Sequence, residues 1–405
     1  MEAKHEFTDQ LPPEEKQYSY LNLGPTHPAT HGIFQNVLKM DGEIIVEAEP
    51  TIGYIHRAFE KLAERRPFYQ ITPLTDRMNY CSSPINNMGW HMTVEKLLNI
   101  ELPKRVQYIR IVIMELSRIA DHIICNTIIG QDTGATTGFL YLFQMRERIY
   151  EIFEEICGAR LTTNIGRIGG MERNIPKRAW EKIDAFMVDF PPALQEFTNL
   201  LERNRIFMDR TINCGSISAE RALAYSFSGP NLRAAGVDYD VRVMTPYSSY
   251  EEFDFIIPVG TNGDTYDRFM VRQSEMWESM KIIRQALEKI KKEPAHIYKA
   301  DVPEFVLPPK EEVYNNMEAL IYQFKIVMGE TDVPKGEVYH CVEGGNGELG
   351  FYLISDGGRT PFRLHFRRPC FIYYQAYPEM IKGSMLSDAI LTMSSMNVIA
   401  GELDA

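Results

Sequence analysis

The sequence predicts an α+β fold in which a mostly helical bundle core carries small antiparallel sheets near the N-terminal and C-terminal regions. Three observations lead to this prediction. Several long segments place apolar residues at helical spacing. Two other segments, 31–50 and 336–371, alternate apolar and polar residues and contain turn residues. The 405-residue chain is 44% hydrophobic and 24% charged, which is the composition of an ordinary folded protein.

Six segments have the spacing of amphipathic or buried helices. They cover residues 52–66, 84–100, 104–129, 139–160, 176–210 and 263–292. Segment 104–129 is apolar on most faces, so we expect it to be the central buried helix. Segment 176–210 should form one or two helices with a hinge at Pro191 and Pro192, because proline interrupts a helix.

Turn residues mark the β segments and suggest how the chain is organised. Asp41-Gly42 predicts a hairpin within 31–50, and the turns GGNG and DGG predict a small sheet within 336–371. We therefore divide the chain into an N-terminal arm (1–19), a small β region (20–50), a helical core (51–335), a small antiparallel sheet (336–375), and a C-terminal helix and tail packed on the core (376–405).

The bulk composition excludes several classes of function. A net charge of -12 disfavours nucleic acid as a partner, because phosphate binding needs concentrated Lys and Arg. No stretch of about 18 uncharged apolar residues occurs, so we expect no membrane-spanning helix. The six cysteines are scattered and form no CxxC motif, so we expect free thiols, mostly buried, rather than a zinc or cluster site.

The segment GPTHPATHG (24–32) places His27 and His31 four residues apart. A residue before proline is disfavoured in the α region, so this segment should be a turn and not a helix. The helical metal pair is therefore excluded, and no acidic residue within the segment completes a metal site. Two interpretations remain for these histidines, a structural role in a loop and a role as a proton donor near neutral pH.

The segment TPLTDRMNYCSSP (72–84) is dense in polar side chains between two prolines, just before a predicted helix. Loops on rigid scaffolds often carry function, and a tyrosine such as Tyr80 can donate a hydrogen bond or a proton. The alternative is a packed loop with a surface ion pair between Asp76 and Arg77.

Charged residues also occur within the predicted helices. Glu115, Arg118 and His122 share one face of the central helix, where pairing of Glu115 with Arg118 would offset the cost of burial. Asp132 follows that helix and could either hold a histidine in its charged form or cap the next helix.

Two further segments have simple structural interpretations. Glu60 could pair with Arg57 at i, i+3 spacing on a helix. VGTNGD (259–264) lacks the lysine of a phosphate-binding loop, so we expect a turn and a helix cap there.

Seven segments occur together in this chain: GPTHPATHG, IHRAFEKLAE, DRMNY, KRVQYIRIVIMELSRIADH, QDTGATT, RERIYEIFEEICGAR and VGTNGDTYDR. Together they resemble the D subunit, or 49 kDa-type subunit, of the respiratory NADH:quinone oxidoreductase, complex I. The resemblance extends over nearly the whole chain and is more specific than any single motif. That family is related to the large subunit of nickel–iron hydrogenases, which implies a hydrogenase-large-subunit-like fold.

The resemblance also implies what has replaced the hydrogenase metal. Two CxxC motifs hold the metal in hydrogenases, whereas here the first region is CSSP, with Cys81 followed by Pro84, and NVIAGELDA has no cysteine. Nickel requires soft thiolate ligands, so this chain alone should bind no metal and no other cofactor. The implied replacement is a quinone cavity shared with a neighbouring subunit that carries the last iron–sulfur cluster.

Four residues match functional positions of the family. His31 and Tyr80 match its quinone-contacting histidine and tyrosine, and Asp132 matches the acid that pairs with that histidine, so these three form the implied catalytic set. Arg57 matches the arginine beside the cluster of the partner subunit. The chain ends in GELDA where the family usually has GEVDR, so any salt bridge made by the terminal arginine should be missing.

The function implied by the resemblance is that of the quinone-site subunit in the peripheral arm of a proton-pumping NADH:quinone oxidoreductase. The implied location is the cytoplasmic side of the bacterial inner membrane. The implied partners are quinone, the subunit with the terminal cluster, the C subunit and the membrane quinone-channel subunit. Two alternatives are a subunit of a ferredoxin-linked or membrane-bound hydrogenase-type complex, and a structural subunit without chemistry of its own.

Overall fold

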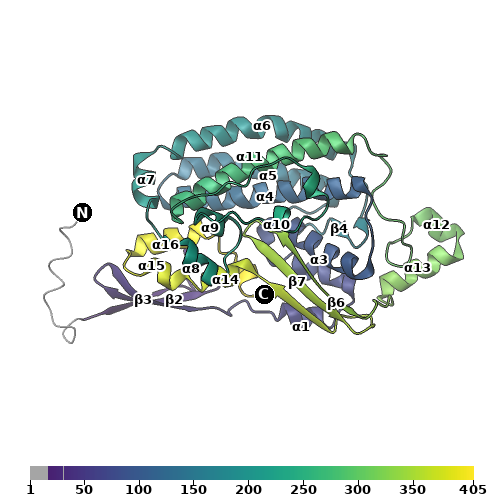
Figure 1. Ribbon diagram of the computed structural model, residues 1–405, viewed down its shortest axis with the longest axis horizontal. Coiled ribbons are helices and arrows are strands. Elements are labelled where there is room, and N and C mark those ends of the chain that lie inside the picture. The colour runs from purple at the N-terminus through teal and green to yellow at the C-terminus, as the bar shows by residue number, and fades with distance from the viewer. Residues whose placement is uncertain (1–16, 31) are drawn as a thin grey trace.

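The computed structural model describes residues 17–30 and 32–405, and its longest helices form a bundle along the long axis of the molecule (Figure 1). The bundle consists of α4 (Lys104–Asp132), α5 (Thr136–Cys157), α6 (Lys177–Leu201) and α11 (Thr265–Ile290). α4 packs against both α5 and α11, while α6 covers α5. The predicted mostly helical core is therefore confirmed.

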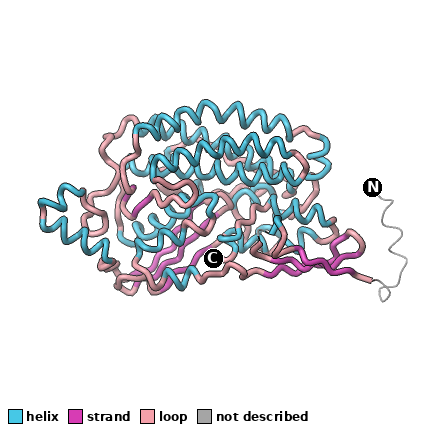
Figure 2. The backbone as a smooth tube through the Cα atoms, turned by 180° about the vertical axis from the view of Figure 1, so that it is seen from behind, coloured by secondary structure: helices cyan, strands magenta, loops and turns pink. Residues whose placement is uncertain are grey.

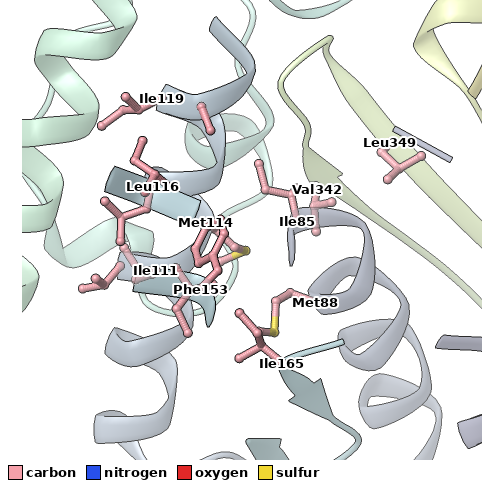
Figure 3. Packing of buried hydrophobic residues seen from close by; sticks show 14 of the residues in the cluster. Ile85, Met88, Ile111, Met114, Leu116, Ile119, Phe153, Ile165, Val342 and Leu349 are labelled. Atoms are coloured by element: carbon pink, nitrogen blue, oxygen red, sulfur yellow. The ribbon is translucent and has the colours of Figure 1, made fainter. Parts of the chain in front are cut away.

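The central helix α4 is buried along most of its length, as its apolar sequence predicts. Figure 3 shows its side chains near those of α5 and of α3 (Ser83–Leu98), with Val342 of the C-terminal sheet beside Ile85 of α3. The labelled residues of this core are Ile85, Met88, Ile111, Met114, Leu116, Ile119, Phe153, Ile165, Val342 and Leu349. Each large apolar side chain buried in this way stabilises the fold by roughly 1.5–3 kcal/mol.

The predicted hinge at Pro191 and Pro192 is wrong. α6 continues through both prolines and ends only at Leu201, before the short helix α7 (Arg205–Thr211). The buried face of α6 runs unbroken across the prolines, with Phe190 on one side and Leu194 on the other, and it packs on α5. Burial of that face outweighs the cost of about 3 kcal/mol for a proline inside a helix.

The N-terminal sheet is antiparallel and has the strand order β1-β2-β3. Its strands are β1 (Ser19–Leu23), β2 (Gln35–Asp41) and β3 (Ile44–Thr51). The hairpin predicted at Asp41-Gly42 joins β2 to β3, and Gly42 has a φ of 62°, which favours glycine. β1 was not predicted, because four of its five residues are exposed and its sequence does not alternate.

The C-terminal sheet confirms the second β prediction. Its strands are β6 (Gly336–Glu343), β7 (Glu348–Ser355) and β8 (Arg363–Arg367), paired antiparallel in that order. The sheet packs on α3. A two-stranded ribbon, β4 (Gly166–Arg167) and β5 (Gly170–Met171), completes the three small sheets of an α+β fold.

The predicted helix 52–66 is much shorter than expected. α1 spans only Phe59–Ala63, and Ala58 before it has a left-handed φ of 52°. The segment before Ala58 is instead a loop tied to the C-terminal tail. This long-range contact is invisible in the local spacing of apolar residues.

Short helices connect the larger elements and close the C-terminal side. Those near the C-terminus are α14 (Pro369–Tyr374), α15 (Tyr377–Ile381), α16 (Leu386–Ser395) and α17 (Ala400–Leu403). The remaining α-helices are α2 (Thr72–Thr75), α8 (Ala219–Ala224), α9 (Gly229–Ala234), α10 (Val241–Met244), α12 (Lys310–Asn315) and α13 (Met317–Met328). Seen from behind, α12 and α13 project at the end opposite the N-terminal sheet (Figure 2).

Two further features of the chain concern its cysteines and the length of its apolar helices. All six cysteines are free thiols, as predicted from their spacing. Within residues 17–30 and 32–405, no helix is long and apolar enough to cross a membrane.

Candidate functional site

A pocket of about 230 Å³ opens where the central helix α4, helix α5 and the segment after α16 meet Tyr80. Its apolar wall is formed by side chains of α4 and of the C-terminal segment, namely Ile124, Ile128, Met393, Val398 and Ile399. Polar groups enter it from Tyr80, Arg146, Ser394 and Asn397. An apolar cavity with a few converging polar groups is the usual form of a small-molecule site.

Tyr80 is held by the turn in which it lies. It begins the 3₁₀ helix η3 (Tyr80–Ser82), where the side chain of Asn79 accepts a hydrogen bond from the Cys81 N–H at 3.1 Å. Asn86 on α3 donates to the Asn79 carbonyl at 2.9 Å. The backbone of Gly401 approaches this turn so closely that a Cβ there would lie 2.7 Å from the Met78 carbonyl. The C-terminal tail therefore fixes the turn from the other side.

The hydroxyl of Tyr80 sits in a poorly hydrated environment. Burial raises the pKa of Tyr80 to about 12, and the nearby positive charge of Arg146 opposes this rise. The neutral, hydrogen-bond-donating form of the tyrosine is therefore strongly favoured at neutral pH.

The predicted surface pair of Asp76 and Arg77 is wrong. Asp76 is buried, and its carboxylate accepts a hydrogen bond from the Asn87 side chain at 2.6 Å. Burial raises the pKa of Asp76 to about 6. Arg77 is exposed and donates to the Pro73 carbonyl at 2.6 Å.

Asp132, the last residue of α4, lies beside the pocket. Its carboxylate accepts a hydrogen bond of 2.5 Å from the hydroxyl of Ser394, a residue of the pocket wall. Partial burial raises the pKa of Asp132, and the bond from Ser394 opposes that rise. His31, its implied partner, lies outside the residues that the structure describes, so pairing of Asp132 with His31 stays a prediction.

The segment around His27 is the turn that its prolines predict. Residues Pro28–Thr30 form the 3₁₀ helix η1, and Nδ1 of His27 accepts a hydrogen bond from the Ala29 N–H at 3.1 Å. The hydroxyl of Thr30 donates to the His27 carbonyl at 2.9 Å. His27 thus bonds within the turn, while Ala29 contributes to the pocket wall.

Arg57 lies on the loop before α1, away from the wall of this pocket. It is exposed, and its guanidinium lies 5.8 Å from the ring centre of Phe59. The predicted pairing of Arg57 with Glu60 is wrong, because Glu60 binds Arg363 at 3.0 Å and His365 at 2.8 Å on β8.

The C-terminal GELDA tail holds the loop that carries Arg57. Asp404 accepts a hydrogen bond from the Ile55 N–H at 2.8 Å, and its carbonyl lies 2.7 Å from Nδ1 of His56. Arg368 donates to the carbonyl of Ala405. These contacts attach the tail to the loop before α1 and to the N-cap of α14.

The buried pair expected on the central helix is confirmed, with one change. Nε of Arg118 lies 3.2 Å from the Glu115 carboxylate. His122 instead contacts Glu275 of α11, at 2.7 Å. These groups lie in the core and not in the pocket wall.

The match to known proteins identifies the family. The family described as "Respiratory-chain NADH dehydrogenase, 49 Kd subunit" matches residues 132–405. The chain is 76% identical over 385 residues to an NADH-quinone oxidoreductase D subunit of Cytophaga hutchinsonii, covering 95% of this chain and 98% of that protein. The chain belongs to the D-subunit family of NADH-quinone oxidoreductase, complex I.

Two further relatives match over nearly the whole of this chain. The D subunit of Flavobacterium johnsoniae is 74% identical over 390 residues, covering 96% of this chain and 94% of that protein. A C/D protein of Bdellovibrio bacteriovorus is 46% identical over 388 residues, covering 96% of this chain and 69% of that protein.

In the part of the chain that the structure describes, no group of three His, Cys, Asp or Glu side chains could hold a metal ion. Cys81 instead lines the pocket as a buried thiol, whose pKa burial raises well above its ordinary range.

Sequence reasoning missed three polar groups of the pocket, Arg146, Ser394 and Asn397. Arg146 stands within the segment RERIYEIFEEICGAR, where nothing in the spacing sets it apart from its charged neighbours. Ser394 and Asn397 lie far along the chain from the other pocket residues, so only the fold brings them to Tyr80.

Proposed function

We propose that the pocket beside Tyr80 is the site at which this oxidoreductase reduces quinone to quinol. The single observation that supports this most directly is a half-buried tyrosine, Tyr80, in the wall of a cavity that combines apolar side chains with a few polar groups. A quinone headgroup needs an apolar slot together with hydrogen-bond donors for its carbonyl oxygens.

Reduction of one quinone consumes two electrons and two protons. A proton donor must lie within hydrogen-bond reach of each carbonyl that is protonated, and a tyrosine or histidine suits this role. We assign one donor role to Tyr80. Because its pKa of about 12 makes a tyrosinate costly, its proton must be replaced quickly.

We assign the second donor role to His31, with Asp132 as its partner. A carboxylate beside a histidine favours the charged form and keeps its proton available at higher pH. When His31 gives up its proton, the Asp132 carboxylate loses its compensating charge. This local charge change is our candidate for the start of the signal to the membrane arm. Full quinone reduction and full proton pumping in Asp132→Asn would contradict it.

The proposed place of the chain is the peripheral arm, on the cytoplasmic side of a bacterial inner membrane, beside the quinone-channel subunit. Electrons would come from the iron–sulfur cluster of a neighbouring subunit, with Arg57 near that cluster. The C/D relative joins its C and D parts in one chain, which supports association of this chain with a C subunit.

The role of Arg57 has its own test in the assembled complex. A positive charge near an iron–sulfur cluster favours the reduced form and raises the cluster potential. Redox titration should therefore show a lower potential in Arg57→Ala. An unchanged potential would reject this role.

The experiment that tests the proposed function is Tyr80→Phe in the assembled complex. We expect NADH:quinone activity to fall by about 10²-fold or more, as for loss of a proton donor. Electron transfer from NADH to an artificial acceptor that bypasses the quinone site should be unchanged. Tyr20→Phe is the matched control, since Tyr20 is 70% exposed on β1. Normal quinone activity in Tyr80→Phe would contradict the proposal and favour a structural role.

A further inference from the structure

Arg146 on α5 lines the same pocket as Tyr80 but lacks, within residues 17–30 and 32–405, the carboxylate partner that a guanidinium in such a position normally has. Its one hydrogen-bond partner in these residues is the hydroxyl of Tyr150. Among the described residues, no carboxylate lies within ion-pair distance of it. Its Nε is buried and has no hydrogen-bond partner in the described part of the chain. A partly buried charge without a counter-charge is unfavourable, because burial weakens its solvation.

Aromatic rings hold the guanidinium in place without neutralising it. It lies 4.4 Å from the ring centre of Tyr150 and 5.0 Å from that of Phe143, both on α5. Contacts of this kind stabilise a cation by only about 0.5–2 kcal/mol and leave its full charge facing the cavity. The side chain is therefore oriented in advance, with unused hydrogen-bond donors.

The fully buried arginines of the chain have partners that Arg146 lacks. Arg118, Arg233 and Arg242 each form an ion pair with at least one buried carboxylate. Arg268 and Arg272 have no such pair, but each bonds to several backbone and side-chain oxygens. Arg146 has neither arrangement, and it is the arginine that lies in the pocket wall.

We propose that Arg146 is the anion-holding residue of this pocket: its free N–H groups bind the oxygen that becomes negative while quinone is being reduced. This inference rests on the proposed quinone function. Electrons entering the quinone ring from outside the chain place negative charge on the carbonyl oxygens until protons arrive. Donors already aimed at that charge stabilise it without reorganisation.

Arg146 does not transfer a proton in this proposal. A guanidinium stays protonated throughout, so both protons of the quinol come from other groups. After Tyr80 donates its proton, Arg146 also faces the resulting tyrosinate. It is the positive charge that opposes the rise in the Tyr80 pKa, which is the direction needed to offset the cost of that tyrosinate.

The test compares two variants. Arg146→Gln removes the positive charge, whereas Arg146→Lys keeps the charge but replaces the planar guanidinium with an ammonium group. In the assembled complex we expect Arg146→Gln to lower kcat for quinone by about 10²-fold, the usual loss for one anion-binding donor. The kcat of Arg146→Lys should lie between the kcat of Arg146→Gln and that of the unchanged protein. Arg148→Gln is the matched control on α5, because Arg148 is 40% exposed and bonds to Asp189 instead. Equal kcat in Arg146→Gln and the unchanged complex would overturn the proposal.

A binding measurement keeps the proposal testable if Arg146→Gln lowers the amount of assembled complex. The probes are 2-hydroxy-1,4-naphthoquinone, which is an anion at neutral pH, and neutral 1,4-naphthoquinone, each used as a competitor of quinone. The unchanged complex should prefer the anion by roughly tenfold, and Arg146→Lys should weaken that preference through loss of the bidentate fork. The proposal would be overturned if the unchanged complex and Arg146→Lys preferred the anionic naphthoquinone to the same degree.

The two proposals fail in different ways. If the pocket does not bind quinone, replacing Tyr80 or Arg146 changes neither quinone activity nor the competition by the naphthoquinones. If only the role of Arg146 is wrong, Tyr80→Phe still loses quinone activity, but replacing Arg146 changes neither kcat nor the preference for the anion.

Discussion

The middle of α4 carries buried charges and its C-terminal end carries an exposed one, and the two are partnered differently. In its middle, Glu115 bonds to Arg118 and to Arg242, both at 3.2 Å. At its end, Asp132 bonds only to a serine hydroxyl among the described residues, and Arg146 across the pocket has no carboxylate. One region of the molecule pairs its charges, whereas in the other Asp132 and Arg146 have no ion-pair partner within residues 17–30 and 32–405.

Two glutamates show the consequence of this difference. Glu115 and Glu402 are both almost completely buried, at 0% and 2% exposure. Burial alone would raise the pKa of Glu115, but Arg118 and Arg242 outweigh it and hold that pKa at about 2. Burial also raises the pKa of Glu402, and hydrogen bonds from neighbouring residues oppose this only in part, so that pKa is about 7.

The compensated region extends well beyond α4. Arg233 on α9 contacts Glu275 at 2.7 Å and Glu343 at 2.9 Å, and Glu275 also contacts His122 at 2.7 Å. Such a network links the bundle to the C-terminal sheet. Compensated charges hold the architecture together, whereas uncompensated charges gathered at a cavity indicate chemistry.

The largest expected effect follows from breaking the compensated region with Arg233→Met. The change leaves Glu275 and Glu343 buried without their main counter-charge, which costs about 3–5 kcal/mol. We expect little assembled complex in membranes, measured as the amount of enzyme and its midpoint of thermal inactivation. A normal amount of equally stable complex would show that the network is dispensable.

A somewhat smaller effect, with a pH signature, is expected for Glu402→Gln. The folded-state pKa of Glu402 is raised to about 7 from an ordinary value of 4.5, so the folded chain holds a proton that the unfolded chain releases. Stability from this group therefore falls as pH rises from 4.5 to 7, by about 3 kcal/mol in all. Glutamine carries no ionisable proton, so the variant should lose this dependence.

The measurement for Glu402→Gln is the difference in thermal inactivation midpoint between variant and unchanged complex at pH 5 and at pH 8. At pH 8, the inactivation midpoint of the variant should rise relative to that of the unchanged complex. The same difference at both pH values would mean that Glu402 is not held protonated.

Asp404→Ala should have a local and smaller effect. It removes the acceptor for the Ile55 N–H, which costs about 1–3 kcal/mol for a hydrogen bond of this kind. Hydrogen exchange of residues 52–58 should become faster, while the core of α4 stays protected. Asp254→Ala is the control, because the side chain of Asp254 is 84% exposed. Unchanged exchange in the loop would show that other contacts hold it.

The smallest effect is expected for a surface pair, with Arg205→Ala. Arg205 and Asp209 lie 3.6 Å apart, with side chains 93% and 70% exposed. Exposed ion pairs contribute about 0–1 kcal/mol, so the inactivation midpoint should hardly move. A loss as large as that of Arg233→Met would refute the contrast between buried and exposed pairs.

The parts of the fold that depend on local pattern could be predicted from the sequence. The apolar run of α4, the Asp41-Gly42 turn and the alternation of β6 to β8 each specify their structure locally. The failures depend on distant contacts. Residues 52–58 are a loop because Asp404 binds them, and α6 passes Pro191 because its apolar face is buried on α5.

The site was only partly predictable for the same reason. The family resemblance selected Tyr80 and Asp132, and the structure places Tyr80 in the pocket wall and Asp132 beside it. Ser394, the partner of Asp132, lies 262 residues further along the chain. Arg146 is distinguished by the lack of a carboxylate partner among the described residues, and a sequence motif contains no information about such a contact.

The most direct test of the central claim is photoaffinity labelling of the assembled complex with an azido-quinone, followed by peptide mapping. The pocket beside Tyr80 predicts adducts on residues 80–81, 124–128 and 393–399, abolished by excess unlabelled quinone. The claim that this pocket is the quinone site would be contradicted if these three segments stayed unmodified and the labelling that excess quinone abolishes occurred only in other segments.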